Sequence, residues 1–170
     1  MSPLRTGLLL CLWLGVTPSA LPASVEAPTW VTVGQGSYKR LFIPVYDARL
    51  EALQSQFDFP RTRPFALTFT YKLDLEAEDL IDNVFTQWKQ QKLVVPETWH
   101  KRMQQVMPNI RKGDSLRLEV NEDDIAVLLH NGKPIANFND PEFINAFVGI
   151  WLGDHSTHTT LRQQLLGSHP

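Results

Sequence analysis

Cysteine is nearly absent from this 170-residue chain, and several other features that identify classes of protein are also missing. The one cysteine, Cys11, lies inside an N-terminal apolar run, so a chain that loses this run is not built on disulfides. Sixteen basic residues face 18 acidic ones without forming a basic stripe, which argues against a nucleic-acid partner. No second apolar run or polybasic segment predicts a membrane span or anchor.

The sequence also lacks the short motifs of the common catalytic and metal sites. It contains no His-Glu-x-x-His, Gly-x-Ser-x-Gly, Cys-x-x-Cys or phosphate loop. The carboxylates between Asp74 and Asp82 have the spacing of a solvated helix start. His155 and His158 have only Asp154 near them as a third metal ligand, so we expect a solvated turn there. No metal or cofactor is therefore predicted, and the catalytic residues, if any exist, are unknown.

The N-terminus has the layout of a secretory signal peptide. A short basic start with Arg5 precedes an apolar run over residues 8–16, and small residues and prolines follow. We expect cleavage after Ala23, with Ala20 and Ala27 as the alternatives. The mature protein is then secreted and, on this reading, periplasmic.

Residues 24–170 suit a single domain with one sizeable core. Apolar and polar residues alternate with period two over residues 65–71 and 116–120, which predicts half-buried strands. Asn131-Gly132 lies between two extended runs and predicts a hairpin turn, because both residues accept a positive φ. Upstream, the extended pattern runs through residues 37–43.

Four helices are expected between and after these strands. Apolar stripes predict helices over residues 76–92 and 96–107, and Asp140-Pro141 caps and opens a third helix. Trp151 lies on the apolar face of this third helix and is predicted to belong to the core. A short last helix can be closed by Gly167. The order of the elements favours an α+β domain, in which helices cover one face of an antiparallel sheet.

Several short segments also follow the order and spacing of one known family. They are residues 33–36, 45–50, 69–71, 79–88, 113–114, 131–132 and 145–167. Together they resemble the chalcone isomerase-like proteins of bacterial envelopes. The resemblance implies an open-faced β-sandwich of the chalcone isomerase type, which is a large antiparallel sheet with helices packed on one face.

The resemblance also implies a choice of functions. Plant enzymes of this family cyclise a chalcone with an arginine that follows a Gly-x-Gly segment, whereas non-catalytic relatives hold a fatty acid in the same cleft. Here Gly34 and Gly36 are present, but Ser37 or Tyr38 occupies the position of the arginine. We therefore expect non-catalytic binding of a small apolar or amphipathic ligand, for example a fatty acid. The alternatives are an isomerase that acts on an enone, and a structural or partner-binding envelope protein with a filled core.

Four residues are the candidates for ligand binding. Tyr38 and Arg40 share a strand face with Phe42 by parity, and an arginine between aromatic rings can bind an anion. The alternative is that the neighbouring glycines and proline shift this parity and leave Arg40 in water. Tyr46 and Tyr71 end apolar strand patterns, where each either contacts a ligand or is a core tyrosine with a satisfied hydroxyl.

Overall fold

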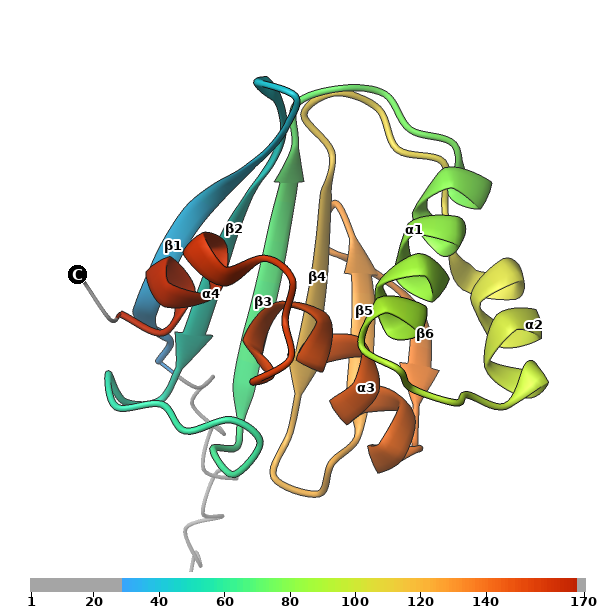
Figure 1. The fold of residues 1–170 in the computed structure, drawn as a ribbon. Coiled ribbons are helices and arrows are strands. Elements are labelled where there is room, and N and C mark those ends of the chain that lie inside the picture. The colour runs from blue at the N-terminus through green and yellow to red at the C-terminus, as the bar shows by residue number, and fades with distance from the viewer. Residues whose placement is uncertain (1–28, 168–170) are drawn as a thin grey trace, which may run out of the picture.

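The structure is a computed structural model and describes residues 29–167. The predicted signal peptide, residues 1–23, and both alternative cleavage positions lie outside this range. Six strands form one antiparallel sheet, and each strand pairs with its neighbours in sequence order (Figure 1). The strands are β1 (Val31–Arg40), β2 (Ile43–Ala52), β3 (Phe65–Tyr71), β4 (Ser115–Val120), β5 (Ala126–His130) and β6 (Lys133–Phe138).

Four helices lie against one face of this sheet (Figure 1). α1 (Ala77–Gln90) and α2 (Glu97–Val106) connect β3 to β4, whereas α3 (Pro141–Leu152) and α4 (Thr159–Leu165) follow β6. Among the described residues, no helix is both long and apolar enough to cross a bilayer. The predicted α+β class and open-faced antiparallel sheet are confirmed.

The core fills most of the layer between the sheet and the helices. Alternate residues of β3, from Phe65 to Tyr71, are buried on the helix side, as the period-two pattern predicted. The carboxylate of Asp140 accepts hydrogen bonds from the amides of Glu142 and Phe143, so α3 begins where the sequence indicated. Trp151 on this helix is 6% exposed, which confirms its predicted place in the core.

The opposite face of the sheet is polar. Arg117 of β4 forms ion pairs with Glu51 and Glu119 and donates a hydrogen bond to the Thr68 hydroxyl. Its guanidinium also lies over the ring of Trp30, 5.4 Å from the ring centre. This face therefore carries a charged network around Arg117.

Two hairpins of the sheet turn with nearly the same backbone geometry. Asn131 and Gly132 have φ values of 51° and 77°, as predicted. Leu41 and Phe42, between β1 and β2, have φ values of 48° and 69°. The extended run predicted through residue 43 is therefore wrong, because the chain reverses at Leu41-Phe42. Nothing in the residue types indicated this turn, since bulky side chains there are disfavoured by ~1–2 kcal/mol each.

Candidate functional site

A cavity of about 850 Å³ lies between the sheet and helices α1 and α3. Its volume is within the range of small-molecule sites, which is roughly 300–1,000 Å³. The residues of β3, β4 and β5 that line it are mainly apolar, as are those of α3. Among them are Phe69, Leu116, Leu118, Leu128 and Phe147.

Three tyrosines form a row across this cavity wall. Tyr38, Tyr46 and Tyr71 are paired in register on β1, β2 and β3, and therefore point to the same face of the sheet. The rings of Tyr38 and Tyr46 are stacked with centres 5.1 Å apart, and those of Tyr46 and Tyr71 meet edge to face at 5.8 Å. The row presents aromatic rings and hydroxyls to one end of the cavity.

The hydroxyls of two buried tyrosines in this row have different surroundings. Trp151 donates a hydrogen bond from Nε1 to the Tyr46 hydroxyl oxygen, at 2.9 Å. The Tyr71 hydroxyl forms no hydrogen bond with any other residue of the described chain, although a buried tyrosine normally has a partner. Burial raises the pKa of both phenols above the ordinary value, so both remain protonated near neutral pH. Tyr71 can therefore donate a hydrogen bond to a molecule in the cavity.

Arg40 lies at the mouth of the cavity, at the end of β1. It is the one positively charged residue among the described residues that line the cavity, and it forms no ion pair with any of them. Asp79 and Asp82 line the same mouth from the first turns of α1. The mouth therefore has a cationic side on the hairpin and an acidic side on the helix.

A row of polar side chains on α1 extends from the acidic side of the mouth into the cavity. Asn83, Gln87 and Gln90 line the cavity at helical spacing beside the apolar Val84. Gln87 is buried and accepts a hydrogen bond from the Thr157 hydroxyl. The cavity is therefore amphipathic, with an apolar floor on the sheet and a polar row along α1.

His158 packs against the tyrosine row. Its ring meets that of Tyr38 edge to face, with centres 4.7 Å apart, while His155 is exposed. Burial lowers the pKa of His158, and its Nε2 has no hydrogen-bond partner. The solvated turn expected from the sequence is therefore wrong for His158. Within the described residues, no group of His, Cys, Asp or Glu has the arrangement of a metal site.

The structure brings the four predicted residues Tyr38, Arg40, Tyr46 and Tyr71 to one cavity. Phe42 does not join them, because it lies in the turn and is 96% exposed. Whether the four bind a ligand stays a prediction.

Sequence reasoning did not identify the contributions of Trp151 and of the α1 polar row to this cavity. The spacing of Asn83, Gln87 and Gln90 next to an apolar stripe was the available signal for the row. No local pattern indicated that the Trp151 indole would meet Tyr46.

Comparison with known proteins agrees with this architecture. Residues 34–167 match the sequence model of the family described as chalcone isomerase-like. The chain belongs to the chalcone isomerase-like family. An uncharacterized protein of Haemophilus influenzae is 28% identical over 140 residues, which cover 81% of this chain and 68% of that protein. The fold is also similar to that of a fatty-acid binding protein of Arabidopsis thaliana. That comparison has a TM-score of 0.62 at 11% identity and covers 86% of this chain and 90% of the other.

In this chalcone isomerase-like protein, the Gly-x-Gly segment allows α4 to approach β1. A Cβ atom on Gly34 would lie 2.2 Å from the carbonyl oxygen of Gln164, and one on Gly36 would lie 2.8 Å from a side-chain carbon of Leu161. The next residue, Ser37, donates a hydrogen bond to Asp47, away from the tyrosine row. The segment therefore has a packing role, and no arginine follows it on the cavity wall until Arg40.

Proposed function

We propose that this protein is an exported, non-catalytic binding protein for an amphipathic molecule with an acidic head, of which a fatty acid is the best-matched class. The observation that carries the proposal is the amphipathic cavity, which combines an apolar floor with one cation at its mouth among the described residues. An alkyl chain lies on the floor formed by the leucines and phenylalanines. The carboxylate lies near Arg40, and the free hydroxyl of Tyr71 is a second donor.

The cavity argues against the alternative of a structural protein with a filled core. An isomerase is also less well supported, because ring closure on an enone requires a fixed cation or an ordered hydrogen-bond donor at the developing oxyanion. Arg40 is exposed at the rim, and Tyr46 and Tyr71 remain protonated near neutral pH, so neither phenol is a general base. Binding an unreactive carboxylate needs fewer fixed groups than catalysis does, since one cation and one hydroxyl are enough to bind it.

Displacement of a fluorescent fatty acid from the purified mature protein tests the proposal. A hydrogen bond to a charged group contributes ~1.5–3 kcal/mol, and for the exposed Arg40 we expect the lower limit, an affinity about tenfold weaker in Arg40→Gln. The matched control is Arg49→Gln, because Arg49 is exposed on the neighbouring strand β2 and does not line the cavity. Equal loss in both variants, or no displacement by the unmodified protein, would contradict the proposal.

Export is supported by the sequence pattern of residues 1–23 alone. N-terminal sequencing of the protein from its own cells should begin near Ser24. Soluble protein that retains Met1 or Cys11 would show that the segment is not removed.

A further inference from the structure

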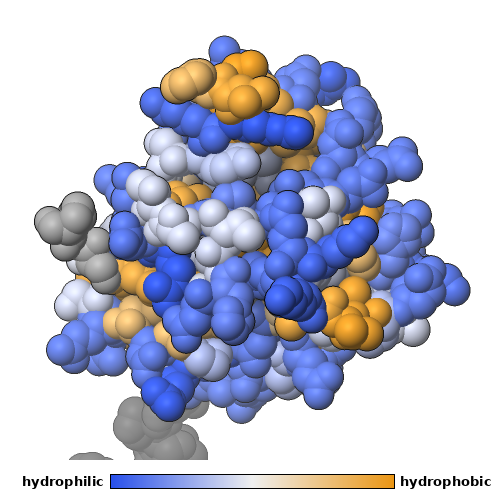
Figure 2. Space-filling view, viewed as in Figure 1, coloured by the Kyte–Doolittle hydropathy of each residue, from blue (hydrophilic) through white to orange (hydrophobic). Residues whose placement is uncertain are grey.

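The turn between β1 and β2, together with the first residue of β2, carries three consecutive large apolar side chains in water. Leu41, Phe42 and Ile43 are 84%, 96% and 59% exposed, and we call these three residues the hairpin tip. Figure 2 shows an apolar cluster at this end of the molecule, above a band of hydrophilic residues. A run of exposed apolar residues normally opposes solubility and is tolerated where it contacts something.

The backbone of the hairpin tip also adopts a conformation that its residues disfavour. Leu41 and Phe42 have the positive φ values that the β5–β6 hairpin assigns to Asn131 and Gly132. The β5–β6 hairpin therefore has Asn-Gly, the residue pair that this backbone geometry favours. Leucine and phenylalanine at the equivalent positions are unfavourable both for the backbone and for solvation. Their presence indicates that these side chains have a role outside the fold.

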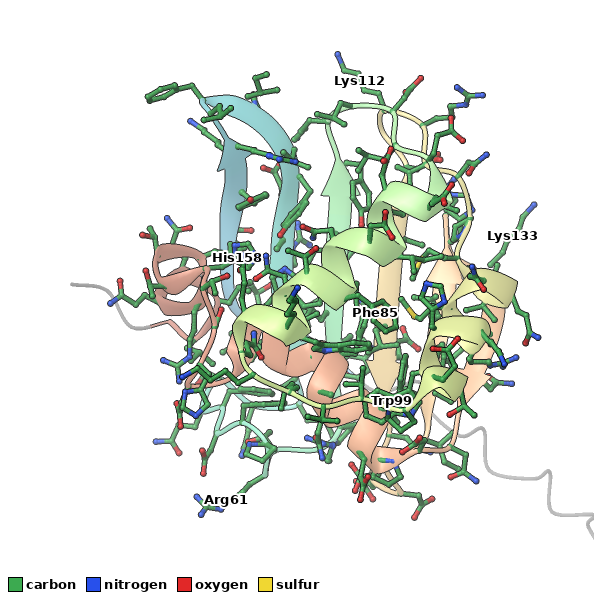
Figure 3. The ribbon with its side chains drawn as sticks, turned by 45° about the vertical axis from the view of Figure 1, so that its right-hand side comes forward. Arg61, Phe85, Trp99, Lys112, Lys133 and His158 are labelled. Carbon is green, nitrogen blue, oxygen red and sulfur yellow. The ribbon has the colours of Figure 1, made fainter. Side chains whose placement is uncertain are left out.

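The hairpin tip borders the mouth of the cavity. Leu41 and Ile43 line the cavity together with Arg40, so an apolar path leads from the exposed tip to the cavity floor. The loops that follow β3 and precede β4 lie at the same end of the molecule, where Figure 3 labels Lys112. Anything that covers the hairpin tip therefore also faces the mouth of the cavity.

Lys39 and Arg40 directly precede the hairpin tip in the chain, and Lys112 lies at the same end of the molecule (Figure 3). Among the described residues, Lys39, Arg40 and Lys112 are exposed and form no ion pair, whereas Lys72 is paired with Asp47. The acidic residues at the mouth, Asp79 and Asp82, lie on α1, and Asp74 in the loop after β3 is paired with Arg111. A protruding apolar tip with free cations beside it complements an anionic lipid surface, because the apolar side chains enter the acyl boundary while the cations meet phosphate groups.

We propose that the hairpin tip inserts into the surface of an anionic lipid bilayer and places the mouth of the cavity against it. The tip consists of three residues, whereas a specific interface with a protein partner or a second copy usually involves about 20–30 residues on each side. An amphipathic ligand then passes between the bilayer and the cavity without crossing water. This transfer step rests on the proposed ligand-binding function, whereas the docking of the tip does not.

Co-sedimentation of the mature protein with vesicles tests the docking. We expect binding to vesicles of phosphatidylcholine mixed with phosphatidylglycerol, and much weaker binding to vesicles of phosphatidylcholine alone. Replacing Phe42 by glycine removes an aromatic side chain from the interface and should weaken partitioning about tenfold or more. Lys39→Gln should weaken partitioning about fivefold, and added salt should weaken it as well.

Two controls separate docking from folding and from ligand binding. Val94→Gly removes another fully exposed apolar side chain, from the loop at the opposite end of α1, and should leave vesicle binding unchanged. Phe42→Gly should unfold at a higher denaturant concentration than the unmodified protein, because glycine accepts the positive φ at this position. Loss of vesicle binding together with a gain in stability cannot result from misfolding.

The outcomes are distinguishable from those of the ligand assay. Equal partitioning of Phe42→Gly and the unmodified protein would overturn the docking proposal, as would equal binding to both kinds of vesicle. A Phe42-dependent dimer in gel filtration would identify the tip as a self-association surface instead, and would also overturn it. Vesicle docking without displacement of the fluorescent fatty acid would leave docking standing and remove the proposed ligand.

Discussion

The indole of Trp151 donates a hydrogen bond to the hydroxyl of Tyr46, although the two residues lie 105 positions apart in the chain. The bond joins α3 to β2 at the wall of the cavity. Both groups are buried, so each depends on the other for its polar contact. This pair therefore links the stability of the domain to the shape of the candidate site.

Removing either partner should destabilise the protein. We expect Tyr46→Phe to cost ~1–3 kcal/mol of unfolding free energy, because it leaves the buried indole N–H without a partner. Trp151→Ala should cost ~3–5 kcal/mol through lost burial and cavity formation. Tyr38→Phe is the control, since the Tyr38 hydroxyl has no hydrogen bond within the described chain. Denaturant unfolding measures all three, and a cost below about 1 kcal/mol for Trp151→Ala would mean that the indole does not belong to the core.

Two glycine-to-alanine changes should have opposite effects on stability. Gly34→Ala places a methyl group 2.2 Å from a carbonyl oxygen of α4, so the helix must shift and the unfolding free energy should fall. Gly149→Ala meets no atom closer than 4.0 Å and should stabilise α3 by ~0.5–1 kcal/mol through backbone entropy. Thermal unfolding of both variants checks the pair. A stable Gly34→Ala would show that α4 does not pack tightly on β1.

Burial of His158 should make stability depend on pH. Its pKa in the folded protein is lowered from the ordinary value of 6.5, so the unfolded chain takes up a proton first as the pH falls. The unfolding free energy is therefore at its full value above pH 6.5 and decreases as the pH falls from there towards the folded pKa. His158→Gln should reduce this slope, and His155→Gln is the exposed control. An unchanged slope in His158→Gln would contradict the lowered pKa.

A bulky side chain that fills the cavity should abolish ligand binding without unfolding the protein. Val84 is buried and lines the cavity from α1, so Val84→Phe should abolish binding of a fluorescent fatty acid while the protein stays folded. Val127→Phe makes the same change on β5 away from the cavity and should leave binding intact. Retained affinity in Val84→Phe would place the ligand elsewhere on the molecule.

The protein should not cyclise a chalcone above the spontaneous rate. The reaction needs a donor fixed at the ketone oxygen, and loss of one such donor typically lowers the rate ~10²–10³-fold. Arg40 is the one cation among the described cavity residues, and it is exposed at the mouth. Absorbance of the chalcone followed with and without the protein is the measurement. Cyclisation that disappears in Arg40→Ala would favour the isomerase instead.

The sequence alone determined the elements whose signals are local. Alternation placed β3, helical stripes placed α1 and α2, Asp140 began α3, and Asn131-Gly132 turned the last hairpin. These signals rest on backbone preferences and on which side of an element is apolar, so they act within a few residues. The order of these elements and the family resemblance then sufficed for the fold class.

The tertiary structure decided what depends on residues far apart in the chain. Strand register brought Tyr38, Tyr46 and Tyr71 into one row, and helix packing left a cavity beside it. The turn at Leu41-Phe42 opposes the preferences of both residues, so no local rule predicts it. Pairing between β1 and β2 imposes that turn, because the energy of a whole sheet ladder exceeds the local cost of two unfavourable backbone conformations.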